Sequence, residues 1–512
     1  MAPYYLKTIV TAAQSYLPQV RSDMLVLGLY EDTKTLPEPL TALDQAAGGI
    51  ISQLIKLGDF TGKANETALL YCNSDLPCRR ILLVGLGQKK SLSLNTLRQA
   101  AGTAARQADK LATAQIALAL HILTDSKFPP ELIGQALAEG AIIGRYNFKD
   151  YLTPGNKKAK QIQTLRITIV DPKASIIRKI NTGCKVGTAL GEAQNLTRSI
   201  ANKPGNEINP PTLAQVAQRL ARQFGLRCKV FDDKQLLKIK MNTILAVGGG
   251  SASKPRLIML EYDGRRGRPK TDGPANAVIV GKAITFDSGG LSLKPSGAME
   301  SMKFDKSGGC NVLGILTGAA QLKLPLHIIG LIPAAENLPS HTSYRPGDIV
   351  RTYSGKTVQI DNTDAEGRLI LCDALSYAAR LKPAAIVDMA TLTGACVVAL
   401  GEHHAGLFSN NTALQRKLEN AAQASGEGLW PMPSGPDYLD QMKSKIADLK
   451  NTGGREGGAC TAAAFLGEFV ENKPWAHIDI AAVADTDKEK PYRGIGSTGF
   501  AVRLVLEYLR SL

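Results

Sequence analysis

Short apolar runs alternate with alanine-rich stretches along the first third of the chain. The runs have the length of buried β-strands, and the alanine-rich stretches are typical of helices. This pattern predicts strands at 24–27, 81–84, 116–120 and 165–170, and helices at 95–110 and 131–145. Because such alternation is typical of a mainly parallel sheet, we predict a smaller N-terminal α/β domain over residues 1–180.

A long helical stretch of roughly 180–201 follows and ends at Asn202-Lys203-Pro204-Gly205-Asn206. Proline and glycine stop a helix there, so we predict a linker helix over 181–206. The alternation then restarts, with helices expected at 212–223 and 366–381 and strands at 257–260, 277–280, 328–331 and 385–388. We therefore predict a larger C-terminal catalytic α/β domain over 207–512 with a central mixed sheet.

Composition indicates a globular protein of the cytoplasm. Hydrophobic residues make up 44% of the 512 positions, which is far above the range of disordered chains. The eight cysteines form no CxxC pair, so we expect reduced thiols of an intracellular protein. No apolar run reaches about 18 residues and the N-terminus does not read as a secretory signal, so we expect no membrane association.

Positive charge is concentrated in the middle of the chain. The net charge is +16, and residues 101–300 contain 30 basic and 15 acidic residues. Clustered cations bind nucleic-acid backbones by counterion release, so DNA binding is an alternative function. No nucleic-acid-binding module is recognisable, which favours an idle basic surface. The two clusters are Lys157, Lys158, Lys160, Lys173, Arg178, Lys179 and Lys185, and Arg265, Arg266, Arg268 and Lys270.

The candidate chemistry begins in an apolar, glycine-rich run, Val280 to Pro295, that contains isolated charges. Lys282 and Asp287 lie in what looks like a buried strand, where an unpaired charge would cost several kcal/mol. Either an internal lysine–aspartate pair or a bound metal would compensate the buried charges. The run itself leaves both interpretations open.

Further carboxylates favour a metal. Asp305 lies downstream, and Asp364 and Glu366 are two positions apart at the start of a predicted helix, so both can face one point. Four carboxylates and one amine in an apolar pocket require divalent cations, with Zn²⁺ or Mn²⁺ expected and Mg²⁺ or Co²⁺ possible. Two metals about 3.5–4 Å apart can share a bridging hydroxide that acts as the nucleophile. The sequence has no HExxH or GxSxG motif that would indicate a zincin or a serine hydrolase.

These residues also lie within a family motif. The eight residues Asn362 to Leu369 resemble the complete signature of the leucyl aminopeptidase family, the dinuclear-zinc exopeptidases also called cytosol aminopeptidase or aminopeptidase A or I. The resemblance covers about 300 residues of the second domain, and the first 180 residues match in layout more than in motif. The further matching segments are 280–295, 390–396, 406–410, 461–466 and 474–481.

The resemblance implies a role for each matching residue. Two metals would be ligated by Lys282, Asp287, Asp305, Asp364 and Glu366. Asp287 and Glu366 would bridge them, Asp364 would also offer its backbone carbonyl, and Lys282 would ligate as the neutral amine. Lys294 would polarise the scissile carbonyl, and Arg368 would anchor a bicarbonate ion that serves as general base.

Substrate and assembly follow from the same resemblance. It implies release of a leucine-like N-terminal residue from short peptides with a free amino terminus, by a homohexamer whose sites face an internal cavity. The resemblance also extends to bacterial relatives that bind DNA, so the alternative function is that of a DNA-binding accessory or regulatory protein, with or without peptidase activity. The pocket for the first side chain would be lined by Met302, Thr391 and Gly394. Two positions depart from the family pattern: Ala283 replaces a usual glycine, and Lys306 follows the ligand Asp305. We expect the Lys306 side chain to be solvated and to point away from the site.

Overall fold

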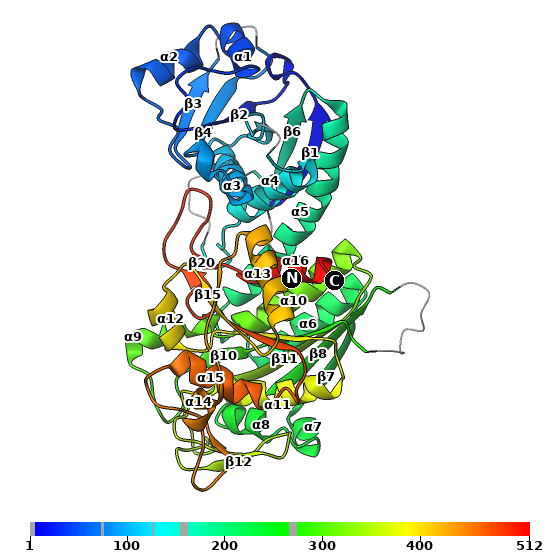
Figure 1. Cartoon of the computed structure of the whole chain (residues 1–512), viewed down its shortest axis with the longest axis vertical. Coiled ribbons are helices and arrows are strands. Elements are labelled where there is room, and N and C mark those ends of the chain that lie inside the picture. Colours follow the sequence, from blue (N-terminus) through cyan, green and yellow to red (C-terminus); the bar gives the residue numbers. More distant parts are fainter. Residues whose placement is uncertain (1–5, 73–75, 125–126, 154–161, 266–273) are drawn as a thin grey trace. The chain divides into compact units, whose positions relative to one another are not determined.

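The computed structural model describes residues 6–72, 76–124, 127–153, 162–265 and 274–512, which form two compact units (Figure 1). The first unit contains Met1–Asn195 together with the late segment Asp487–Ile495, and the second contains Leu196–Thr486 and Gly496–Leu512. Helix α5 (Ala174–Ala201) begins before the expected position and runs across the predicted boundary at 180. The division at 180 and 206 therefore stays a proposal.

The first unit is built on a six-stranded sheet in the order β1-β6-β5-β2-β4-β3, in which all pairs are parallel except the one between β3 and β4. The α/β prediction is confirmed for this unit. The two strands that the sequence pattern misses, β1 and β3, are the edge strands, and their residues are mostly half-buried or exposed. The strands are β1 (Lys7–Gln14), β2 (Met24–Leu29), β3 (Thr67–Tyr71), β4 (Arg80–Gly85), β5 (Gln115–Ala119) and β6 (Thr164–Asp171).

Two helices of the first unit, α3 (Leu94–Lys110) and α4 (Pro130–Arg145), pack with their backbones in close contact. A Cβ atom added to Gly140 would lie 2.0 Å from the carbonyl oxygen of Arg98, so only glycine fits this crossing. The late segment Asp487–Ile495 packs against the same helices, since a Cβ on Gly102 would lie 3.0 Å from the Tyr492 carbonyl oxygen and Arg106 forms an ion pair with Glu489. The remaining elements here are α1 (Leu40–Ala46), α2 (Ile50–Leu57), η1 (Leu17–Gln19) and η2 (Lys89–Ser91).

The second unit contains a nine-stranded mixed sheet in the order β16-β15-β18-β14-β9-β11-β8-β7, and β10 pairs with β11. Strands β11, β9, β14 and β18 are mutually parallel and almost wholly buried, while β7, β8 and β15 run antiparallel to their inner neighbours. The strands are β7 (Arg227–Phe231), β8 (Arg256–Asp263), β9 (Ala277–Gly281), β10 (Ala283–Asp287), β11 (His327–Asn337), β14 (Ile386–Ala390), β15 (Ala405–Ser409), β16 (Leu429–Pro431) and β18 (Trp475–Asp479). The predicted larger domain with a mixed sheet is confirmed.

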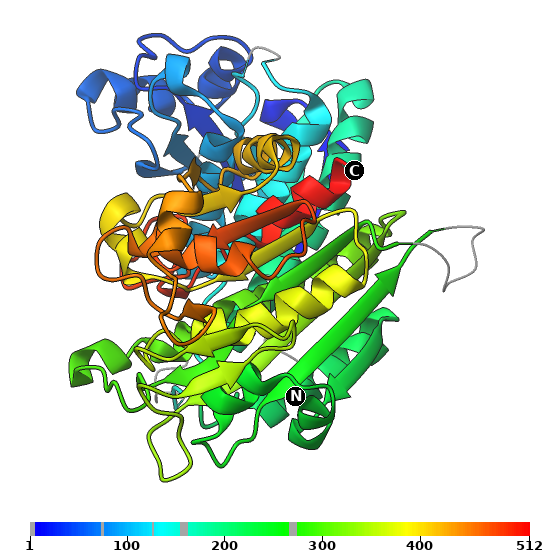
Figure 2. The ribbon, with the colours of Figure 1, turned by 60° about the horizontal axis from the view of Figure 1, so that its bottom comes forward.

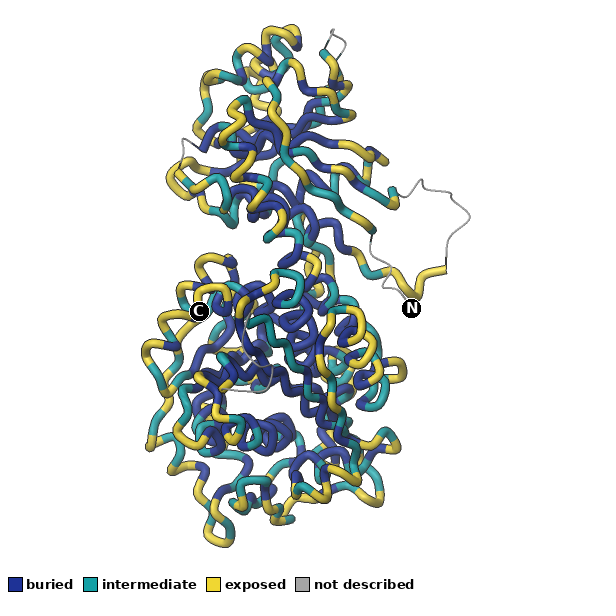
Figure 3. Tube along the Cα trace, turned by 90° about the vertical axis from the view of Figure 1, so that its right-hand side faces the viewer, coloured by how far each residue is buried: buried dark blue, intermediate teal, exposed yellow. Residues whose placement is uncertain are grey.

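Helices cover both faces of this sheet (Figure 1), and Figure 2 shows the yellow helix α11 lying over the sheet, roughly along its strands. One face carries α6 (Pro210–Phe224), α10 (Ser307–Leu322), α13 (Thr412–Ser425) and α16 (Val502–Arg510); the other carries α8 (Asn242–Gly248), α11 (Gly367–Arg380) and α15 (Gly458–Gly467). Buried residues are gathered between these layers (Figure 3). Smaller elements are α7 (Asp233–Lys238), α9 (Ser296–Met299), η3 (Met302–Phe304), α12 (Gly394–Leu400), α14 (Pro436–Asp440), β12 (Ile349–Arg351), β13 (Thr357–Gln359), β17 (Leu449–Lys450), β19 (Asp485–Thr486) and β20 (Gly496–Ser497). Within the described ranges, no helix is both long and apolar enough to span a bilayer.

Candidate active site

The parallel strands of the second unit end in polar residues at one edge of the sheet. Lys282 follows β9, Asn337 ends β11, Thr391 follows β14 and Asp479 ends β18. Because the carboxyl ends of parallel strands meet at the same edge, these side chains share one region, which is where open α/β sheets bind ligands. Strand β10 continues from Lys282 along β11, and its last residue, Asp287, pairs with Asn337.

Asp287 is held at this edge by hydrogen bonds to one carboxylate oxygen. The Asn337 side-chain amide and the backbone N–H of Gly289 both donate to Asp287 Oδ1, each at a distance of 2.9 Å. Two more carboxylates, Asp364 and Glu366, come from the loop that precedes α11. The ligand atoms of these three acids lie within 4.8 Å of one another, and Asp287 and Glu366 are buried. The loop thus delivers its acids to the strand end as the two-residue spacing predicts.

The loop that carries Asp364 and Glu366 is fixed through its backbone. The Thr363 hydroxyl donates to the carbonyl oxygen of Gly289 over 2.6 Å, and the Thr363 carbonyl accepts from the Tyr344 hydroxyl at 2.7 Å. The Asn451 side-chain amide donates to the carbonyl of Asn362 over 2.7 Å. These contacts leave the acidic side chains free to face the site.

Lys282 lies between two of the predicted ligands. Its Nζ is 2.8 Å from both Asp305 Oδ1 and Glu366 Oε1, and it donates to the Thr391 carbonyl over 2.8 Å. The amine reaches this position because residue 367 is glycine: a Cβ there would lie 2.7 Å from Lys282 Nζ. The glycine of the motif therefore makes room for the lysine.

Lys294 contacts the other two carboxylates. Its Nζ lies 3.0 Å from Asp287 Oδ2 and 2.5 Å from Asp364 Oδ1. The loop that carries it turns at Gly289 and Gly290, whose φ angles of 85° and 66° favour glycine. The site thus brings together all five predicted ligands and Lys294.

The excess of carboxylates sets the electrostatics of the site. Burial, reinforced by Glu366 and Asp287, raises the pKa of Asp305 to about 8, although Lys282 opposes the shift. Burial also raises the pKa values of Asp364 and Glu366. Burial would lower the pKa of Lys282, yet Asp305, Glu366 and Asp287 outweigh it and raise that pKa. Four acids facing two lysines leave excess negative charge, which either bound protons or further cations must offset.

The donor set fits divalent cations. The second oxygen of Asp305, Oδ2, is buried and has no hydrogen-bond partner in the part of the chain that the structure describes. A buried carboxylate oxygen without a donor is costly unless a ligand completes it. Carboxylate oxygens with one amine are ligands that Zn²⁺ and Mn²⁺ accept. The residues present therefore fit the expected metals.

Arg368 is buried in the first turn of α11 and has an uncommitted donor. Its Nη1 donates to the Asn451 carbonyl over 2.9 Å, whereas its Nε is buried without an acceptor among the described residues. Burial lowers the pKa of Arg368 to about 10, while Glu366 and Asp479 act in the opposite direction. A guanidinium of this kind fits a small anion such as bicarbonate.

Two of the three residues expected to line the substrate pocket, Met302 and Thr391, contact Asp305. Met302 is the first residue of η3. The Thr391 hydroxyl donates to Asp305 Oδ1 at a distance of 2.7 Å. Gly394 opens α12, and a Cβ there would meet nothing within 4 Å. Open space at Gly394 is compatible with a pocket for a side chain.

The two departures from the family pattern have different outcomes. Ala283 is fully buried, and its methyl group is accommodated because the facing residue is Gly309, where a Cβ would lie 2.6 Å away. For Lys306 the prediction of a solvated side chain is wrong. The residue is fully buried, and its Nζ donates to the carbonyls of Ala201 (3.1 Å), Lys203 (2.7 Å) and Lys303. Lys306 ties the end of α5 to the turn before Asp305.

We expect Lys306→Met to lower the free energy of unfolding of the metal-free protein by about 3 kcal/mol at pH 7, because three buried carbonyls lose their donor. Burial lowers the pKa of Lys306 from 10.5 to about 8. Between these values the unfolded chain binds more protons than the folded one, so the stability of the wild type rises with pH and the variant lacks this gain. Urea titrations at pH 7 and pH 10 should show a deficit that grows with pH. If Lys306→Met were destabilised equally at both pH values, the lowered pKa of Lys306 would be contradicted.

Sequence reasoning missed the residues that hold the site from outside the motif. Asn337 is the one amide residue of the apolar strand β11 and lies at its carboxyl end. This position could have identified it as a site residue. Asp479 has a similar position at the carboxyl end of β18, within the matching segment 474–481, whereas Asn451 and Tyr344 carry no comparable signal. Tyr344 contacts Thr363, which is 19 residues away in the chain, whereas Asn451 contacts Asn362 and Asp479 contacts Thr393 across 89 and 86 residues.

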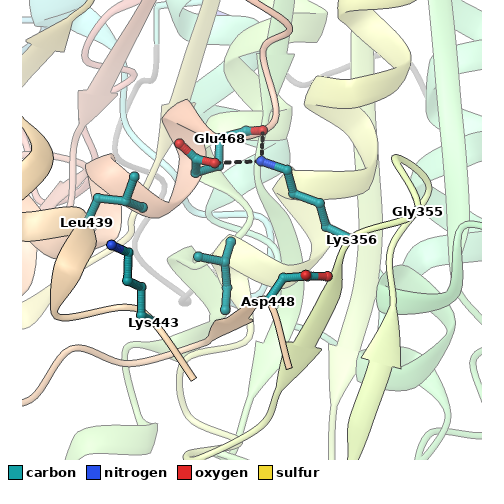
Figure 4. A pocket seen from close by; sticks show the side chains of 7 residues that line it. Gly355, Lys356, Leu439, Lys443, Asp448 and Glu468 are labelled. Carbon is teal, nitrogen blue, oxygen red and sulfur yellow. Dashed lines mark hydrogen bonds and ion pairs between the residues drawn. The ribbon is translucent and has the colours of Figure 1, made fainter. Parts of the chain in front are cut away.

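A separate cavity of about 430 Å³ lies beside β13 (Figure 4). Its charged side chains are engaged with one another or with neighbours. Lys356 pairs with Glu468 at 2.5 Å, Lys443 pairs with Asp440 at 2.6 Å, and Asp448 accepts from the Thr357 backbone at 2.7 Å. The lining residues include none of the predicted site residues.

The basic clusters are only partly described. Lys157, Lys158, Lys160, Arg266, Arg268 and Lys270 lie outside the described residues. Lys173, Arg178, Lys179 and Lys185 are exposed at and near the start of α5, and Arg265 pairs with Asp263 at 2.8 Å. DNA binding stays an untested prediction.

Comparison with known sequences identifies both parts of the chain. The model described as "Cytosol aminopeptidase family, catalytic domain" matches residues 195–506, and that of the family's N-terminal domain matches residues 26–155. Relatives named probable cytosol aminopeptidase include one from Roseiflexus castenholzii, 43% identical over 493 residues, covering 96% of both chains. Another, from Geobacter sp. strain M21, is 41% identical over 494 residues, covering 95% of this chain and 96% of the relative.

Solved structures give the same result. A mutant of tomato leucine aminopeptidase superposes with a TM-score of 0.87 at 32% identity, covering 99% of this chain and 97% of that one. The bottromycin maturation enzyme BotP in complex with Mn superposes with a TM-score of 0.82 at 33% identity, covering 96% and 99%.

Proposed function

Because the chain belongs to the cytosol aminopeptidase family and is a metal-dependent aminopeptidase acting on peptides, we propose that the carboxylate cluster at the β9–β14 edge is its catalytic centre. The observation that carries this proposal is the convergence of Asp287, Asp364 and Glu366 within 4.8 Å, beside Lys282. Such a concentration of buried acids fits cations better than a structural role.

In the proposal two divalent cations, Zn²⁺ or Mn²⁺ with Mg²⁺ or Co²⁺ as alternatives, are held by Lys282, Asp287, Asp305, Asp364 and Glu366. Asp287 and Glu366 would contribute to holding both cations. When bound, the cations lower the pKa of a water molecule so that it attacks at neutral pH, and they polarise the scissile carbonyl. Lys282 must release its proton before it can hold a cation. Cations on its carboxylate partners would offset the negative charge that raises the pKa of Lys282.

Lys294 supplies a positive charge for the transition state. Burial would lower its pKa, but Asp287, Asp364 and Glu366 raise it, so the amine is protonated at neutral pH. When cations take over its carboxylate partners, the ammonium group can donate to the substrate carbonyl oxygen as negative charge develops there. The amine is the electrophile of the proposal.

Arg368 would hold a bicarbonate ion as general base. Its free Nε supports this role, because that donor is buried and lacks a protein acceptor in the described chain. The nearby carboxylates are assigned to the cations, and no histidine is among the predicted site residues. Proton transfer in the proposal therefore uses an added base.

The substrate proposal is a short peptide with a free amino terminus and a leucine-like first residue. Met302, Thr391 and Gly394 would line the pocket for that side chain. An apolar pocket of this kind discriminates weakly, since one methylene is worth about 1–3 kcal/mol. We also propose a homohexamer, as the family resemblance implies, and a location in the cytoplasm, in line with the name of the relatives.

The test is metal-dependent release of leucine from leucine amide. Protein stripped with a chelator should be inactive, and Mn²⁺ or Zn²⁺ should restore turnover. The same cations should raise the melting temperature, because they bind the folded state and relieve repulsion among the four acids. Calcium at the same concentration serves as the control cation. A folded protein that neither turns over substrate nor gains stability with any of the four expected metals would refute the proposal.

A further inference from the structure

The segment 391–394 joins the two halves of the proposed site. At its start, Thr391 contacts the metal side: its carbonyl accepts from Lys282 and its hydroxyl donates to Asp305 Oδ1, at 2.8 and 2.7 Å. At its end, Gly394 faces open space at the proposed pocket for the first side chain. Whatever fixes this segment sets the metal ligands and the substrate pocket relative to each other.

Asp479, at the end of β18, is the residue that fixes it. Its Oδ1 accepts from the backbone N–H of Leu392 at 3.1 Å, and its Oδ2 accepts from the Thr393 hydroxyl at 2.7 Å. Asp479 is fully buried and is the register partner of Ala390, the last residue of β14. Thr393 in turn caps α12 by accepting from the N–H of Cys396 at 3.1 Å. The carboxylate therefore ties β18, the end of β14 and the start of α12 together.

Among the described residues, this carboxylate accepts only from neutral donors: the Leu392 N–H, the Thr393 hydroxyl and the Ala481 backbone N–H, the last at 3.1 Å. Its negative charge acts on Arg368. It raises the pKa of that guanidinium group and so opposes the lowering caused by burial. A carboxylate that bonded directly to Arg368 would occupy the donors that an anion needs. Asp479 supplies charge to the guanidinium while directing its own oxygens at segment 391–394.

We propose that Asp479 is a positioning residue that anchors segment 391–394 and thereby sets both the cation affinity and the choice of the first side chain. The inference rests on the function proposed above. It predicts that loss of the bond between Asp479 and Thr393 weakens both properties, although neither residue is a proposed ligand or a pocket-lining residue.

The bond can be removed from either side. Asp479→Asn keeps an oxygen for the Leu392 N–H but presents an amide to Thr393, and Thr393→Val keeps the shape and loses the hydroxyl. Thr393→Ser retains the bond and should behave as the wild type. For each single variant we expect kcat/KM for leucine amide to fall roughly tenfold, mostly through KM, since a bond to a charged group is lost. The double variant should lose little more than either single one.

Two readouts separate positioning from loss of stability. The ratio of kcat/KM for leucine amide to that for alanine amide should fall, and chelator-stripped protein should bind Mn²⁺ several-fold more weakly in a calorimetric titration. Thr317→Val is the matched control, because the Thr317 hydroxyl is buried and donates to the Leu313 carbonyl within α10. It should lower the melting temperature without changing either readout.

Variants that lose only stability, with the substrate ratio and Mn²⁺ affinity of the wild type, would overturn the inference. The proposed function fails differently: the wild type itself would then show no turnover with any metal. In that case the Mn²⁺ titrations of Asp479→Asn and Thr393→Val against Thr317→Val still decide whether Asp479 positions the cation ligands.

Discussion

Replacing Glu366 by glutamine is expected to lower kcat/KM for leucine amide about a thousandfold or more. The carboxylate lies within 4.8 Å of the ligand atoms of Asp287 and Asp364, and 2.8 Å from Lys282 Nζ. In the proposed site Glu366 would help to hold both cations, so its loss would weaken the binding of each. The amide has nearly the same shape, which limits any effect on folding. Steady-state kinetics with saturating Mn²⁺ would measure the loss.

Metal content should change with activity in the Glu366→Gln protein. Equilibrium dialysis followed by elemental analysis should find fewer than two Mn²⁺ per chain. Glu468→Gln is the matched control, since Glu468 is a partly exposed carboxylate that pairs with Lys356 at the separate cavity (Figure 4). That variant should keep full activity and both metals. Wild-type turnover in Glu366→Gln would show that the cluster is not the catalytic centre.

The second large effect is expected for Lys294→Met, with a fall in kcat of about 100- to 1,000-fold. The amine contacts Asp287 and Asp364 and is proposed to donate to the carbonyl oxygen only as charge develops there. An interaction made mainly in the transition state appears in kcat, so KM should change little. Methionine keeps the length and apolar stem of lysine. Initial rates over a range of leucine amide concentrations separate the two constants.

The metal content of Lys294→Met distinguishes its role from that of a ligand. The variant should bind two Mn²⁺ per chain, as the wild type is expected to do. Lys443→Met is the control, because that lysine is 66% exposed and pairs with Asp440 away from the site. If Lys294→Met lost a metal instead, Lys294 would act on the cation positions and not on the substrate.

The fold follows from the sequence where burial dominates the pattern. Strands β2, β4, β9 and β14 are apolar runs that are buried on both faces, and their pattern predicts them directly. The edge strands β1 and β3 have mixed patterns because one side of each lies in solvent. The buried strand expected around Lys282 and Asp287 is present as β10, but its separation from β9 was not predicted, since only the break at Lys282 divides the two.

The site follows from the sequence where its residues are local. Asp364, Glu366, Gly367 and Arg368 lie in one motif, and their spacing determines what they can face. Asp479 was not predicted, because its contact with Thr393 depends on the pairing of β14 with β18. Lys306 was predicted wrongly for a similar reason. Its acceptors belong to α5, to the loop after it and to η3, which only the tertiary fold brings together.

The late segment Asp487–Ile495 bears on how the protein folds during synthesis. It belongs to the first unit, where Glu489 pairs with Arg106 and the Tyr492 carbonyl lies close to Gly102. Domains generally fold in order from the N-terminus as the chain leaves the ribosome. Here the first unit gains its last contacts only after about 290 further residues have been made. Until then the surfaces of α3 and α4 that receive this segment stay uncovered, so completion of the first unit is coupled to translation of nearly the whole chain.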